Sequence, residues 1–291
     1  MSEAKGMVKT MQKNYKKYFP IFVLPTLLAF IIAFVIPFFM GLYLSFCNFK
    51  TIGSAKWVGL SNYLYVFRDS AGFLSALWFT VKVAIVGVVS TNVLAFALAL
   101  LLTKGLKGTN VYRTIFFMPN LIGGIILGYI WQLLLNGILI RVAGVDLTFN
   151  STFGYWGIII LYNWQKIGYL MIIYIAGIQS ISGDILEAAK IDGANYVQTL
   201  KKIIIPLVMT SITTCTFLAL TDCFKMYDQN LALTGGAPAN QTAMLAMDIF
   251  NTYYNRTGFA GVGQAKAVVF TVLVLVISLI QLRITQSKEV E

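Results

Sequence analysis

Polar and aromatic side chains interrupt two long apolar segments of this 291-residue sequence: Asn163, Trp164, Gln165, Lys166, Asp222, Lys225, Tyr227 and Asp228. A charge at the middle of a membrane helix costs roughly 2.5–3.5 kcal/mol on insertion scales, so these residues are expected to face a cavity or a partner. Asp222, Lys225 and Asp228 recur every third residue, which predicts one helical stripe where the lysine pairs with either acid. The polar side chains of this set can bind sugar hydroxyls, and the aromatic rings can stack against a sugar ring. A structural network, satisfied internally or at an interface, is the alternative interpretation.

Other chemistry has little support in the sequence. Histidine is absent, which removes the commonest general base and metal ligand. Cys47, Cys215 and Cys223 show no paired spacing, so neither a disulfide framework nor a zinc site is indicated. No nucleophile–base pair is recognisable, and no G-x-x-x-x-G-K-[ST] phosphate loop occurs. The chain is therefore predicted to be neither an enzyme nor an ATPase, and to bind no cofactor itself.

The composition is that of an integral membrane protein. Apolar residues make up 58% of the chain and charged residues 11%, against about a quarter charged in soluble domains. Backbone amides in lipid must be paired internally, so apolar blocks of roughly 20 residues are predicted to be helices. The six predicted spans are 20–45, 75–102, 114–135, 155–180, 206–231 and 264–284. The first is too long for a signal peptide and is interpreted as a retained helix.

The basic residues fall mainly on one side of these six spans. One side holds Lys5, Lys9, Lys13, Lys16, Lys17, Lys104, Lys107, Arg113, Lys190, Lys201, Lys202, Arg283 and Lys288. The other holds only Lys50, Lys56, Arg68, Arg141 and Arg256. The positive-inside rule then predicts both termini in the cytoplasm and explains the net charge of +11 without nucleic acid. Lys82 and Lys266 are expected to reach the headgroups from outer helix ends.

The connection 182–206 is predicted to form two short helices around a glycine. Asp184 is expected to cap the first helix and Asn195 the second, because short polar side chains accept bonds from free amides there. Gly193 is expected to adopt a positive φ at the break, and Pro206 to lie in the first turn of the fifth span. These residues alone leave open whether the segment is a functional surface or an ordinary helical hairpin.

This connection resembles the "EAA" motif of ABC importer permeases. The matching positions are Glu187, Ala188, Ala189, Asp192, Gly193, Ala194, Ile203 and Pro206. The resemblance implies a type I permease fold, all-α, with a cytoplasmic coupling helix seated in a groove of the ATPase. It implies that Glu187 contacts a basic residue of the ATPase, that Ala188 packs into the groove, and that Gly193 permits the turn.

Three further stretches are similar to the carbohydrate-uptake (maltose, oligosaccharide and glycerol-phosphate) permeases. They are Trp57-Val58-Gly59-Leu60-Ser61-Asn62-Tyr63; Arg113 with Phe116, Phe117 and Pro119; and Asp228 followed by Leu233-Thr234-Gly235-Gly236, Pro238 and Thr242. Ala237 departs from the last pattern by separating the glycines from the proline. The resemblance implies these partners: a second permease, an ATPase dimer that binds ATP and Mg, an extracellular or periplasmic solute-binding protein, a sugar and the lipid bilayer.

The expected organisation is a basic cytoplasmic N-terminus at 1–19, a permease domain at 20–284 and a cytoplasmic tail at 285–291, in a bacterial plasma membrane. A different cargo (polyol, glycerol phosphate ester or peptide) remains an alternative, as does an ion-driven carrier. Gly123, Gly124 and Gly128 are interpreted as helix-packing positions.

Overall fold

The computed structural model describes residues 19–68 and 72–289. Within these ranges, five helices are long and apolar enough to cross a membrane, and a sixth crossing is made if one bent pair counts as a single span. The first five are Phe19–Leu44, α4 (Phe73–Leu102), α6 (Gly124–Ala143), α7 (Ser151–Gln179) and α14 (Ala260–Gln286). The bent pair is Tyr196–Leu207 with Met209–Lys225. The predicted helical membrane fold is therefore confirmed, and the prediction of six spans agrees with the structure when the bent pair is counted as one span.

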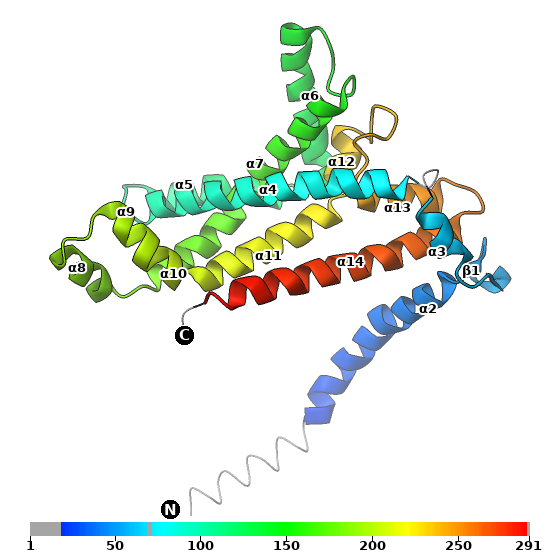
Figure 1. The fold of residues 1–291 in the computed structure, drawn as a ribbon, viewed down its shortest axis with the longest axis horizontal. Helices are drawn as coiled ribbons and strands as arrows, with labels where there is room; N and C mark the ends of the chain where they lie inside the picture. The colour runs from blue at the N-terminus through cyan, green and yellow to red at the C-terminus, as the bar shows by residue number, and fades with distance from the viewer. Residues whose placement is uncertain (1–18, 69–71, 290–291) are drawn as a thin grey trace, which may run out of the picture.

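A bundle of α4, α7, α11 (Met209–Lys225) and α14 forms the body of the chain (Figure 1). Its core is apolar and tightly packed, and Ala95, Ala99, Leu161 and Cys215 have no exposed surface. Gly87 of α4 lets the Tyr162 ring approach, because a Cβ at Gly87 would lie 3.3 Å from that ring. The Tyr162 hydroxyl donates to Ala219 O at 2.9 Å, which joins α7 to α11.

The third span begins later than predicted. The range 114–135 crosses a break between α5 (Thr109–Phe117), the short helix η4 (Met118–Leu121) and α6. Pro119 has no amide hydrogen to continue α5, and Ile122 is extended, with ψ 131. Gly124 and Gly128 lie against α12 (Asp228–Leu233), where added Cβ atoms would be 2.8 Å from Asp228 Cβ and 2.7 Å from Ala232 Cβ. Their predicted packing role is confirmed, whereas Gly123 has open space around it.

The fifth span is bent and ends early. Its first part contains α9 (Tyr196–Thr199), the π-helical turn η5 (Leu200–Ile204) and α10 (Ile205–Leu207). The axis turns by 70° before α11, directly after Pro206, which removes one helical hydrogen bond. Pro206 thus lies in the first turn of the short helix α10 before the bend, and not in the first turn of the fifth span, which begins at Tyr196. Met226 is extended and ends α11 at Lys225, short of residue 231.

The first span leaves the bundle at an angle (Figure 1). It includes the π-helical turn η1 (Ile31–Val35) and α2 (Ile36–Leu44), and η1 has no buried residue. After it come β1 (Cys47–Asn48), η2 (Ile52–Ser54), β2 (Lys56–Trp57) and α3 (Ser61–Val66), with β1 and β2 antiparallel. The buried Asn62 amide donates to Ser45 O at 2.9 Å and Cys47 O at 3.0 Å. One asparagine of the W-x-G-L-x-N-Y run therefore fixes the end of the first span.

Candidate functional site

A helical hairpin projects from one end of the bundle, made by α8 (Gly183–Ile191) and α9 (Figure 1). Gly193 ends α8 with a φ of 76°. Its amide donates to Lys190 O at 3.1 Å, and the Ala194 amide donates to Ala189 O at 2.9 Å. This pair of bonds is the Schellman motif, which satisfies the last carbonyls of a helix. The predicted positive φ at Gly193 is confirmed.

The second helix of the hairpin starts on a reciprocal cap. Asn195 Oδ1 accepts from the Gln198 amide at 2.9 Å, and Gln198 Oε1 accepts from the Asn195 amide at 2.8 Å. The predicted cap at Asn195 is confirmed. The predicted cap at Asp184 is wrong, because Ser182 occupies the N-cap and makes no side-chain bond. Asp184 lies in the first turn, where its charge still suits the helix dipole.

The outer surface of the hairpin is exposed and mixed in character. Glu187, Ala188 and Asp192 are exposed, whereas Ala189 is buried. Ile191 is 86% exposed, which is unusual for an isoleucine on a helix. The Lys104 ammonium lies 4.9 Å from the centre of the Tyr196 ring, which connects the end of α4 to α9. The hairpin therefore has an exposed face of acidic and apolar side chains, and this face does not pack against the bundle.

A polar cluster joins α7 to α11 inside the membrane-spanning region. Lys166 Nζ lies 2.8 Å from Asp222 Oδ2. The lysine also donates to Asn120 Oδ1 of η4 at 3.4 Å. The two charged side chains are 20% and 42% exposed, so the pair lies at the surface of this chain and not in its core. Two of the predicted pathway residues, 56 positions apart in sequence, are therefore in direct contact.

The neighbouring residues of α7 point in different directions. Asn163 is buried, accepts from Thr91 Oγ1 at 2.9 Å and donates to Ser90 Oγ at 2.9 Å, which places its side chain between α7 and α4. Trp164 is 43% exposed and packs edge-on against Trp131, with ring centres 5.6 Å apart. Gln165 accepts from the Gln229 amide at 2.9 Å. The residue at 163 therefore packs within the chain, while the residue at 164 faces outward.

The predicted stripe of Asp222, Lys225 and Asp228 is not continuous. Because Met226 is extended, Asp228 starts the separate helix α12. Asp222 pairs with Lys166, and among the described residues no ion pair involves Lys225. Tyr227 lies at the break with its ring centre 4.9 Å from that of Phe250. The pairing predicted from spacing is wrong, since it assumed one unbroken helix.

Residues 19–289 match the family described as binding-protein-dependent transport system inner membrane component. The chain belongs to this family. It is a membrane component of a transporter and not an enzyme.

Curated relatives of this permease extend over almost its whole length. It is 42% identical to the probable starch degradation products transport system permease protein AmyD of Thermoanaerobacterium thermosulfurigenes, over 93% of this chain and 94% of the relative. It is 31% identical to the trehalose/maltose transport system permease protein MalF of Thermococcus litoralis, over 80% of this chain and 81% of the relative.

A solved structure has the same fold. A chain of a bacterial ABC transporter involved in the import of the acidic polysaccharide alginate superposes with a TM-score of 0.80. The alignment covers 96% of this chain and 99% of that chain at 20% identity. The type I permease fold implied by the sequence is confirmed.

Sequence reasoning missed a buried ion pair at the end of the permease opposite the hairpin. Lys266 of α14 was expected to reach the headgroups, but its side chain has no exposed surface. Its ammonium lies 2.7 Å from Asp248 Oδ2 of α13 (Leu245–Tyr254) and 2.8 Å from Thr252 Oγ1. Burial raises the pKa of Asp248, and the nearby Lys266 charge opposes that rise. The two residues are 18 positions apart on different helices, so their spacing gave no signal.

The glycine-rich segment after α12 is held by a second buried network. Asn230 donates to Thr242 O at 2.8 Å and accepts from the Met244 amide at 2.9 Å. Thr242 donates to Ala237 O at 2.7 Å, and its hydroxyl lies 3.0 Å from that of Thr234. The two threonines of the L-T-x-G-G-P-like segment therefore join the two ends of its loop. The loop accommodates the additional residue Ala237, whose carbonyl accepts one of these hydrogen bonds. Among the described residues, no group of three or more potential metal ligands occurs.

Proposed function

We propose that this permease forms one half of the membrane pathway of an ATP-driven sugar importer, with the α8–α9 hairpin as its contact with a cytoplasmic ATPase. The observation that carries the proposal is the exposed hairpin, which is continuous with the bent fifth span in a chain of this family. The sugar assignment is supported by relatives that are named for starch degradation products and for trehalose and maltose.

The charge distribution supports an orientation with the hairpin in the cytoplasm. Lys104, Lys107, Arg113, Lys190, Lys201, Lys202, Arg283 and Lys288 belong to segments at the hairpin end of the bundle (Figure 1). Basic residues accumulate on cytoplasmic loops. Both termini would then be cytoplasmic, although Lys5 to Lys17 lie outside the described residues.

The mechanism follows from the path of the chain. An ATPase dimer that closes on ATP would move the hairpin, with Glu187 and Ala188 at the contact and Ala189, Asp192, Gly193 and Ala194 shaping it. Motion of α9 passes through η5 and the 70° bend after Pro206 into α11. Asp222 on α11 and Lys166 on α7 would then move relative to each other. A solute-binding protein loaded with sugar would favour the outward-open state through its differential affinity.

The solute pathway would lie between this chain and a second permease. Lys166 and Asp222 are partly exposed, and Trp164, Lys225 and Asp228 are exposed. Their charged groups and the indole ring can bind hydroxyls and stack a sugar ring, with Gln165 and Tyr227 beside them. Asn163 would act indirectly, by fixing α7 against α4. ATP and Mg would be bound by the ATPase and no cofactor by this chain.

The assignment is tested in proteoliposomes that contain this chain, its partner permease, the ATPase and the binding protein. We expect ATP-dependent uptake of labelled maltotriose and little uptake of glycerol 3-phosphate or a tripeptide. Maltotriose uptake that proceeds without ATP would contradict the proposal and favour an ion-driven carrier.

Gly193→Val is expected to lower sugar uptake per ATP hydrolysed at least about tenfold. A non-glycine residue in the left-handed region costs roughly 1–2 kcal/mol, and more when β-branched. A Cβ at Gly193 would meet nothing within 4 Å, so the effect comes from the backbone and not from a clash. Uptake and ATP hydrolysis are measured together in the proteoliposomes.

Two variants control for the added side chain. Gly183→Val places the same group at another open position of the hairpin without a positive φ, and should stay within about twofold of wild type. Gly193→Asn should also be tolerated, because asparagine adopts the left-handed region readily. Normal coupling in Gly193→Val would show that the Schellman turn is not required.

Asp222→Asn is expected to lower the sugar transport rate about tenfold at a saturating concentration of loaded binding protein. Hydrogen bonds to a charged group contribute about 1.5–3 kcal/mol, and the substitution removes the charge that Lys166 and a sugar hydroxyl share. Asp146→Asn, at an exposed loop carboxylate, is the control. An unchanged transport rate in Asp222→Asn would remove this cluster from the pathway.

A further inference from the structure

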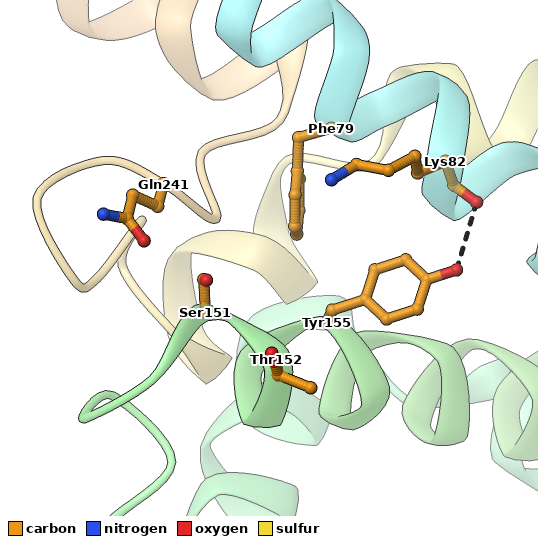
Figure 2. Close-up of a pocket in the computed structure, with 6 residues that line it drawn as sticks. All are labelled: Phe79, Lys82, Ser151, Thr152, Tyr155 and Gln241. Atoms are coloured by element: carbon orange, nitrogen blue, oxygen red, sulfur yellow. Dashed lines mark hydrogen bonds between the residues drawn. The ribbon is translucent and has the colours of Figure 1, made fainter.

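A small pocket lies where α4 meets the start of α7, more than ten residues along α7 from Lys166. Its volume is about 180 Å³. It is lined by Phe79, Lys82, Ser151, Thr152, Tyr155 and Gln241. Figure 2 shows these side chains arriving from α4, from α7 and from the loop after α12.

The pocket carries one positive charge that no carboxylate neutralises. None of the six lining residues is acidic, and among the described residues no ion pair involves Lys82. The Lys82 ammonium extends beside the Phe79 ring, 5.8 Å from its centre, toward the hollow (Figure 2). Tyr155 Oη donates to Lys82 O at 3.3 Å, which fixes this turn of α4 against α7. The backbone of Lys82 is thus fixed at the rim of the pocket, and its exposed side chain carries the ammonium beside Phe79.

The other groups at the pocket suit an anion. Ser151 and Thr152 offer hydroxyl donors, and Gln241 offers an amide. The two hydroxyls lie at the N-terminus of α7, a 29-residue helix whose dipole favours negative charge at that end. Asn150 already accepts from the Thr152 amide at 2.8 Å. A lysine and several neutral donors around a small hollow match the oxygens of a phosphate.

The depth of the pocket identifies the source of that phosphate. Lys82 is twenty residues from Leu102, the end of α4 on the hairpin side, and twenty residues of helix rise about 30 Å. The hydrocarbon core of a bilayer is about 30 Å thick. If Leu102 lies at one headgroup layer, Lys82 lies at the other. Trp156, which is 51% exposed beside Tyr155, provides an aromatic ring at the same level.

We infer that this pocket binds the phosphate of an anionic lipid headgroup in the leaflet opposite the coupling hairpin. The headgroup would tie α4, α7 and the 234–242 loop together at one point. The inference concerns a lipid site, so it does not depend on which solute the transporter carries.

The test measures lipid retention by native mass spectrometry on the complete transporter complex, in detergent supplemented with phosphatidylglycerol or phosphatidylcholine. Wild type should retain phosphatidylglycerol preferentially. Lys82→Met should lower that retention about tenfold and Lys82→Arg should preserve it. Lys50→Met, at an exposed lysine outside the pocket, should behave as wild type. Gln241→Leu, on the exposed loop, gives a second variant that leaves the helix packing intact, with a smaller loss expected.

Equal retention of both lipids by wild type, or undiminished phosphatidylglycerol in Lys82→Met, would overturn the inference. A competition arm separates the two sources of phosphate. Inorganic phosphate, added at the same concentration as the lipid, should not displace the bound phosphatidylglycerol. Displacement would show that the pocket takes free phosphate and would overturn the lipid assignment.

Discussion

Replacing Lys266 by methionine is expected to lower the free energy of unfolding by about 3–5 kcal/mol, because it leaves Asp248 as a buried charge without its partner. The lysine side chain is fully buried and the Asp248 side chain is only 12% exposed. Thr252 would lose its bond to the ammonium as well. The midpoint of thermal unfolding of the detergent-solubilised complex measures the effect.

The double variant Lys266→Met with Asp248→Leu should recover much of the lost stability, since an apolar pair of similar volume often replaces a buried ion pair without cost. Lys288→Met, at an exposed position of the C-terminal segment, is the matched control and should be neutral. A Lys266→Met variant that melts with wild type would mean that the pair contributes nothing to α13–α14 packing.

Gly168→Ala is expected to destabilise the permease by about 3 kcal/mol, the upper end for an overpacked core position. A Cβ at Gly168 would overlap the carbonyl group of Phe116, so α5 would have to move away from α7. The overlapping group is the Phe116 backbone, which cannot move aside as the end of a flexible side chain can. The shift would also separate Asn120 from Lys166, which now lie 3.4 Å apart. Thermal unfolding and sugar uptake are both expected to fall.

Gly137→Ala is the control for Gly168→Ala. Gly137 lies within α6 and has nothing within 4 Å of an added Cβ. Alanine there should be neutral or slightly stabilising, because glycine costs roughly 1 kcal/mol in a helix interior. If both alanine variants melt together with wild type, close contact between α5 and α7 is not required for the fold.

These predictions concern different structural features of the permease. Gly168 fixes α5 on α7, and Lys266 fixes α13 on α14. Gly193 shapes the hairpin that leads into the bent fifth span. A defect at Gly193 should therefore lower coupling in a complex that melts normally, whereas defects at Gly168 and Lys266 should lower the melting temperature first.

The features that the sequence predicted well depend on neighbours along the chain. Long apolar blocks predict spans because the bilayer forbids unpaired backbone. The positive φ of Gly193 and the cap at Asn195 are likewise set within a few residues. The EAA-like motif was recognisable for the same reason, since its residues form one contiguous hairpin.

The features that the sequence did not predict depend on contacts between distant segments or on small backbone departures. One extended residue, Met226, separates Asp228 from the stripe that spacing implied. The N-cap of α8 was predicted two positions too late, because Ser182 and not Asp184 occupies it, without a side-chain hydrogen bond.

The amino-acid sequence by itself determined the membrane class, the spans, the hairpin and the family, because each follows from local hydropathy, local backbone preference or a contiguous motif. Only the tertiary structure decided which charges meet. Asp222 pairs with Lys166 and not with Lys225, and Lys266 pairs with Asp248 instead of reaching a lipid headgroup. Pairing of charges across helices depends on helix rotation and on where each helix ends, and neither quantity is encoded in the spacing along a single segment.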